Sequence, residues 1–130
     1  MKKWAPAPVE AAAAFETATS GLSGGEPRKM FGYSCFFAKG NMFAGLHEVG
    51  MILRLPEEQR REFLRLKGAK QFEPMPGRVM REYVVVPKVL LDSPERLRAW
   101  VEKSLAYALS LPVKAKREHV FGKRPRGTKK

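Results

Sequence analysis

Three strand-like segments separated by very short links restrict the fold of this chain more than any other feature. Residue type and turn signals place these segments at Lys29–Ala38, Met42–Val49 and Met51–Leu55. Parallel neighbours need a crossover of roughly a dozen residues or more, whereas antiparallel neighbours need only a tight turn. Gly40-Asn41 and Gly50 are the links, and glycine takes the positive φ that such turns require. The sequence therefore predicts an antiparallel meander.

Helix signals lie before, between and after the strand-like segments. Pro8, Pro56 and Pro94 each stand where a helix can begin, because proline fits the first helical position. Two further strands are expected at about residues 70–73 and 79–86, between the second and the third helix. The resulting order, α-β-β-β-α-β-β-α, predicts an α+β fold: an antiparallel five-stranded sheet with its helices packed on one side.

Length and composition describe one globular domain. The chain has 130 residues, 44% of them hydrophobic, and a single cysteine, which favours a reducing compartment. No stretch approaches the roughly 18 apolar residues of a membrane span, and Pro6 and Pro8 interrupt the apolar stretch near the N-terminus. We therefore expect a cytoplasmic protein with a flexible lead-in at residues 1–8, a folded domain at 9–111 and a tail at 112–130.

The tail carries most of the charge. The net charge of the chain is +12, and +7 of it falls in residues 112–130, where Glu118 is the single acid. Basic segments broken by glycine and proline bury no core, so we predict that the tail is disordered in isolation. Such arms bind nucleic-acid phosphates without sequence preference. The predicted nucleic-acid-binding residues are Lys114, Lys116, Arg117, Lys123, Arg124, Arg126, Lys129 and Lys130.

Other roles for the tail stay open. A solvated tail without a partner would carry the same charge, and an acidic protein or a membrane surface would also attract it. For the chain as a whole we expect an unidentified protein partner, with transcription machinery as one candidate, and no membrane partner. A homodimer formed through exposed strand edges is a further alternative.

Cys35 and His47 are the one thiol and the one histidine of the expected domain, so they are the candidates for nucleophilic catalysis. If residues 40–41 form the turn, Cys35 pairs with Leu46. Ser34 then pairs with His47, which places the thiol and the imidazole on opposite faces of the sheet. We therefore predict that Cys35 is buried, that His47 lies at the surface or rim, and that the chain is not an enzyme. No ligand spacing predicts a metal or a cofactor.

The methionines are mostly strand residues. Methionine fills irregular gaps in a core, and we interpret these residues mainly in that way. A surface that binds varied peptides is the alternative, because the same flexible side chain adapts to different partners. The six methionines are Met1, Met30, Met42, Met51, Met75 and Met80.

Several segments together resemble the N-terminal domain of the TfoX/Sxy family. They are Arg28–Tyr33, Met42–Leu46, Phe72–Pro74, Pro76–Pro87 and a last helix that contains Trp100. The resemblance covers about residues 9–110. It implies a helix, three strands, a helix, two strands and a helix, a fold similar to that of type III secretion chaperones and YjbR-like proteins.

The resemblance also implies a kind of function. Longer family members are regulators of natural competence that act with a cyclic-AMP receptor protein at promoters, and they carry a second, helical domain. This chain resembles the first domain alone, and the resemblance supplies no catalytic residues. We therefore expect a non-catalytic regulatory or adaptor module that acts through protein contacts, with the basic tail adding nucleic-acid affinity. The alternative is a direct, sequence-nonspecific DNA- or RNA-binding protein that uses the tail.

Overall fold

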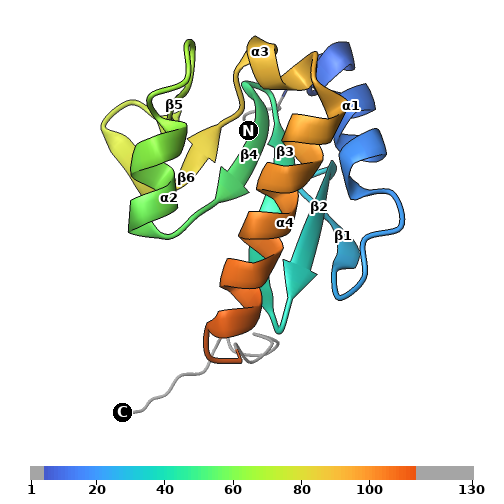
Figure 1. The fold of residues 1–130 in the computed structure, drawn as a ribbon. Helices are drawn as coiled ribbons and strands as arrows, with labels where there is room; N and C mark the ends of the chain where they lie inside the picture. Colours follow the sequence, from blue (N-terminus) through green and yellow to red (C-terminus); the bar gives the residue numbers. More distant parts are fainter. Residues whose placement is uncertain (1–4, 114–130) are drawn as a thin grey trace, which may run out of the picture.

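The computed structural model describes residues 5–113, which form one antiparallel sheet with helices on one of its faces (Figure 1). The elements are α1 (Val9–Thr19), β1 (Glu26–Met30), β2 (Tyr33–Ala38), β3 (Asn41–His47), β4 (Gly50–Arg54), α2 (Glu57–Phe63), β5 (Lys70–Met75), β6 (Arg78–Val85), α3 (Lys88–Leu91) and α4 (Pro94–Ser110). The strand order is β1-β2-β3-β4-β6-β5, and every neighbouring pair is antiparallel. The predicted α+β fold is confirmed.

The sheet has six strands rather than the predicted five, because the segment expected as one strand at Lys29–Ala38 is a hairpin. Met30 pairs with Tyr33, and the two residues between them form the turn. Phe31 and Gly32 have φ values of 55° and 84°. Glycine adopts this region readily, but phenylalanine is rare there, so only the second turn residue carries the usual signal.

The next hairpin turns one residue earlier than predicted. Lys39 and Gly40, with φ values of 52° and 81°, form its turn, and Ala38 pairs with Asn41. A bulge between Phe36 and Phe37 shifts the register again. Cys35 consequently pairs with Gly45 and not with Leu46. A shift of one residue moves side chains to the other face of a strand, so it changes the predicted neighbours of Cys35.

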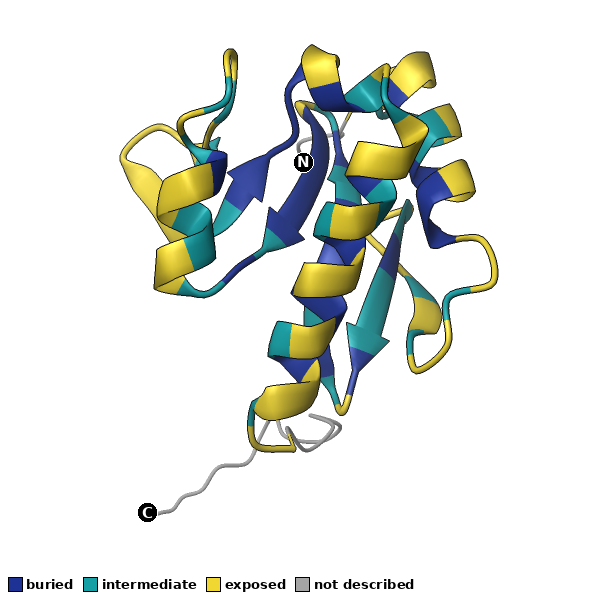
Figure 2. Cartoon of the chain, viewed as in Figure 1, coloured by how far each residue is buried: buried dark blue, intermediate teal, exposed yellow. Residues whose placement is uncertain are grey.

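The main core lies between the helices and one face of the sheet. In Figure 2 the faces of the helices that meet the sheet are dark blue and their outer faces are yellow. Phe43, Met51 and Leu53 from the sheet and Val101 from α4 are fully buried there. Phe63 anchors α2, because its ring meets that of Trp100 on α4 edge to face, with centroids 5.0 Å apart.

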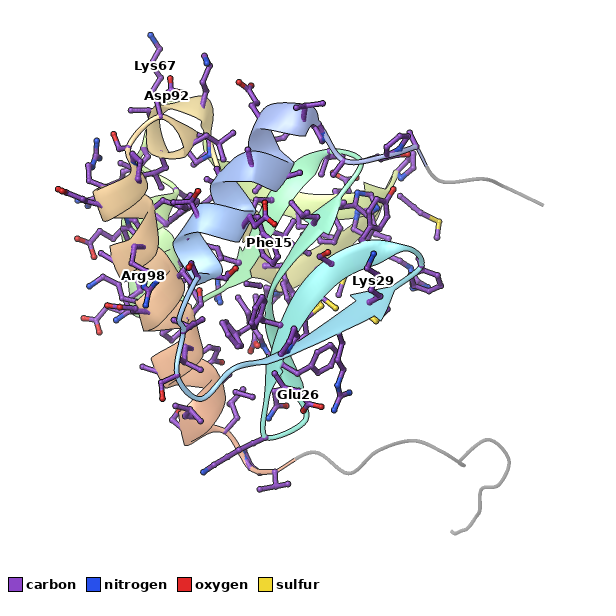
Figure 3. The ribbon with its side chains drawn as sticks, turned by 90° about the vertical axis from the view of Figure 1, so that its right-hand side faces the viewer. Phe15, Glu26, Lys29, Lys67, Asp92 and Arg98 are labelled. Atoms are coloured by element: carbon purple, nitrogen blue, oxygen red, sulfur yellow. The ribbon has the colours of Figure 1, made fainter. Side chains whose placement is uncertain are left out.

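α1 packs beside α4 over the same face. Figure 3 shows Phe15 of α1 pointing toward the sheet, where it is buried, and Arg98 of α4 close to the end of α1. The Arg98 guanidinium donates to the carbonyl of Ser20 at 2.7 Å, which satisfies a carbonyl that the helix end leaves open. Within residues 5–113 no helix is long and apolar enough to cross a membrane.

Candidate interaction surface

The face of the sheet that turns away from the helices is curved around a second apolar cluster. The cluster contains Phe72 of β5, and the ring of Phe72 lies 5.0 Å from that of His47 on β3. β4 and β6 lie between these two strands in the sheet. Strands about 4.8 Å apart would hold them roughly 14 Å apart in a flat sheet. The sheet therefore curls, and the register shifts on both sides of Phe72 are the bulges that bend it.

The curl encloses a cavity of about 340 Å³, which we name the outer groove. Its floor is made of buried residues from the central strands and β5. Cys35 and Phe72 are 3% and 4% exposed, and His47 is 9% exposed. The floor residues are Cys35, Gly45, His47, Ile52 and Phe72.

The prediction for Cys35 is confirmed, and the prediction for His47 is wrong. Cys35 is buried as expected, although it lies on the face that the helices do not cover. His47 is buried rather than at the surface, because the register shift brings it to that same face, where its ring lies 5.5 Å from the ring of Tyr33. Sequence reasoning missed this because it placed the turn one residue too late.

Three polar side chains that line the groove, those of Cys35, His47 and Tyr33, form hydrogen bonds with the protein's own backbone. The Cys35 thiol donates to the carbonyl of Arg28 at 3.5 Å. His47 Nδ1 accepts from the N–H of Val49 at 3.4 Å, and the Tyr33 hydroxyl donates to the carbonyl of Ala5. Burial raises the pKa of the Cys35 thiol, and the nearby charge of Arg28 lowers it by less. The floor is therefore an apolar surface, with a thiol that resists ionisation.

The rim of the outer groove is exposed, and its residues other than Arg78 are apolar. Met30 is 38% exposed, Phe31 76%, Met75 50% and Met80 39%. Exposed apolar side chains that cluster around a hollow are typical of binding sites in a stable protein. The rim residues are Met30, Phe31, Met75, Arg78 and Met80.

The described methionines divide between packed positions and this surface, and Met1 lies outside the described residues. Met51 is fully buried in the main core, as the interpretation of methionine as a core filler requires. Met30, Met75 and Met80 lie exposed at the rim, so that interpretation is wrong for them. Their exposed positions are compatible with the alternative, a methionine-lined surface, which depends on strand pairing that no local sequence pattern reports.

One cation at the rim has no counterion in the described part of the chain. No carboxylate of residues 5–113 pairs with Arg78. The neighbouring Glu73 accepts the N–H of Gly77 at 2.6 Å, and Glu48 accepts the N–H of Ala5 at 3.0 Å. Both of these carboxylates bond to backbone amides rather than to Arg78, so the guanidinium keeps its N–H donors for the carboxylate of a ligand.

A cluster of charged and phenolic groups on another part of the sheet is structural. Arg54 Nε donates to Glu82 at 2.7 Å, and the Tyr107 hydroxyl donates to the other carboxylate oxygen at 3.2 Å. The cluster joins β4, β6 and α4. These bonds hold the three elements together, so the cluster has a structural role.

The predicted nucleic-acid-binding residues, which begin at Lys114, lie outside the described residues. The structure therefore does not place any of them. Within residues 5–113, no three His, Cys, Asp or Glu side chains come together where they could hold a metal ion.

The structure thus defines a small α+β domain with helices on one face of a curled sheet and an apolar groove on the other. The chain belongs to the TfoX N-terminal domain family, because the pattern of that family matches residues 18–108. Comparisons with curated proteins and with solved structures found no match. The resemblance read from the sequence is confirmed.

Proposed function

We propose that this chain is a non-catalytic regulatory adaptor that acts in the cytoplasm through protein contacts, and that the outer groove is its contact surface. Membership of the TfoX N-terminal domain family supports a regulatory or adaptor role. The observation that carries the proposal is the exposed rim, where four large apolar side chains remain in water beside a cavity. Covering such a surface with a partner lowers the free energy, because apolar area is removed from water.

The chemistry of the groove supports a binding role over a catalytic one. A nucleophile needs a base within hydrogen-bond reach or a lowered pKa. Burial has the opposite effect on Cys35, since it raises the thiol pKa. A contact surface requires only shape and apolar area, which the groove has.

The basic tail adds nucleic-acid affinity in this proposal. Its eight lysines and arginines would neutralise phosphates and release counterions, a contribution that does not depend on base sequence. The second candidate function is direct nucleic-acid binding without a protein partner. Its support is the positive charge of the tail alone.

Affinity capture from cell extract treated with nuclease separates the two candidates. The full chain should retain a protein partner after nuclease treatment, and loss of every partner would reject the adaptor function. A full-length variant with glutamine at the eight tail positions should keep that partner but lose binding to labelled DNA and RNA. If the full chain captures proteins only when the nuclease is omitted, and the glutamine variant captures none even then, nucleic acid mediates the contacts and the second candidate is correct.

A further inference from the structure

The residues that line the outer groove indicate the chemistry of the ligand that it binds. We propose that it binds a short segment of a partner protein in which an aromatic or long aliphatic side chain lies within a few residues of an aspartate or glutamate. The apolar side chain enters the cavity and the carboxylate pairs with Arg78. This inference deepens the proposed function and rests on it, because it describes the partner of the same surface.

The exposed rim favours a polypeptide over a small molecule. A cavity of about 340 Å³ is at the lower end of the volumes that hold small ligands, roughly 300–1,000 Å³. A molecule that filled the cavity alone would leave most of the rim in water, where Met75 is 50% exposed and Phe31 is 76% exposed. A peptide that crosses the groove covers the rim as well as the cavity, so it buries more of the apolar surface that is present.

The edge strands favour an anchoring side chain over the addition of a strand. β1 and β5 are the two edges of the sheet, and both contribute residues to the groove. β1 contains Pro27, and β5 contains Pro74 and two register shifts. Proline lacks the N–H of a strand ladder, and a bulge interrupts regular pairing. Specificity must therefore come from the cavity and from charge.

The positive charge of Arg78 at the rim favours a peptide with an acidic residue close to its anchoring side chain. Arg78 lines the cavity without an ion pair in residues 5–113, while Glu73 and Glu48 are hydrogen-bonded to backbone amides. A carboxylate beside the anchor would complete a charge-assisted pair with Arg78. The same charge disfavours the basic tail as the occupant, since that segment carries +7, and it disfavours a second copy of a chain that carries +12.

Selection from a displayed random library of short peptides tests the proposal on the full chain. The enriched sequences should share an apolar anchor with a nearby acid. A labelled peptide from this set should bind with an affinity that falls as salt is added, because one ion pair contributes. No enrichment, or enrichment of basic sequences, would overturn the proposal.

Two substitutions with matched controls locate the bound peptide. Met80→Asp should weaken binding by about 10-fold or more, since it removes apolar contact that a buried side chain of this size provides. Val89→Asp is the control, because Val89 is 40% exposed and Met80 is 39% exposed. Arg78→Gln should weaken binding about 3-fold and reduce its salt dependence, whereas the exposed neighbour Arg81→Gln should not. Equal binding by Met80→Asp and native chains would overturn the proposal.

Three other occupants of the groove would give different results, and each of these results would overturn the proposal of an acidic peptide. A dimer that Met80→Asp dissociates identifies a second copy, and decanoate that binds the groove while no peptide does identifies a small carboxylate. Peptide binding that appears only when the tail is neutralised with glutamine identifies the tail. The proposed function fails separately: if capture after nuclease yields no partner, the adaptor role is rejected whatever the peptide selection gives. A nuclease-resistant partner that Met80→Asp still retains rejects only the groove.

Discussion

Phe31, in the turn at the rim of the outer groove, contributes less to folding than its backbone conformation costs, as expected of a residue that serves binding. Phe31 has a φ of 55°, a left-handed conformation that costs an ordinary residue about 1–2 kcal/mol and asparagine less. Its side chain is 76% exposed, so it buries roughly a quarter of its surface. Full burial of phenylalanine contributes about 3 kcal/mol, so this fraction contributes about 0.7 kcal/mol. Phe31→Asn should therefore stabilise the fold by about 0.5–1 kcal/mol.

Thermal unfolding of the full chain measures this gain. A stabilisation of that size should raise Tm by about 2–6 °C in a domain of this length. Lys39→Asn is the matched control, because Lys39 is exposed and holds the same turn position in the next hairpin with a φ of 52°. Both variants should gain stability, but only Phe31→Asn should weaken binding of a peptide selected on the groove.

The opposite result would refute the reasoning. If Lys39→Asn raises Tm while Phe31→Asn lowers it, the phenylalanine contributes more to folding than its strained backbone costs. Phe31 would then be part of the packing of the hairpin, and its place at the rim would carry no functional meaning.

Three further predictions concern the core, the buried thiol and the polar cluster around Glu82. Phe63→Ala should lower the free energy of unfolding by about 3–5 kcal/mol in urea, since Phe63 is fully buried against Trp100, and a loss below about 1 kcal/mol would show that α2 is not anchored there. The raised pKa of Cys35 means that the unfolded chain loses the thiol proton first, so stability should fall as the pH rises above about 8.5, and the slope should be smaller in Cys35→Ala. Equal slopes in native and variant chains would exclude this thiol as the cause. Tyr107→Phe should cost about 0.5–1.5 kcal/mol through its lost bond to Glu82, and an unchanged urea midpoint would contradict that role.

The sequence was sufficient for the elements that local rules determine. The proline at the first position of α4 predicted where that helix begins, and short glycine links predicted antiparallel pairing. Ser93 holds the N-cap position of α4, although its hydroxyl makes no capping bond. Local rules failed at Phe31, because a turn with phenylalanine at its first position lacks the usual signal.

The groove could not be predicted for a different reason. It depends on bulges in β5–β6 that bring Phe72 to His47 across two intervening strands, and no local pattern reports that curvature. The predicted register was also one residue away from the observed one, which was enough to bury His47 where a surface residue was expected. Binding surfaces assembled from several strands are sensitive to such shifts, whereas the fold class is not.

Photo-crosslinking tests the central claim, that the outer groove is the contact surface of an adaptor. A photoreactive phenylalanine derivative placed at Met80 is compared with one at Leu109 on α4, a residue of matched exposure at 38% against 39%. We predict a discrete, nuclease-resistant crosslink to a partner protein from position 80 and none from position 109. Crosslinks from position 109 alone, or from position 80 to nucleic acid alone, would contradict the account.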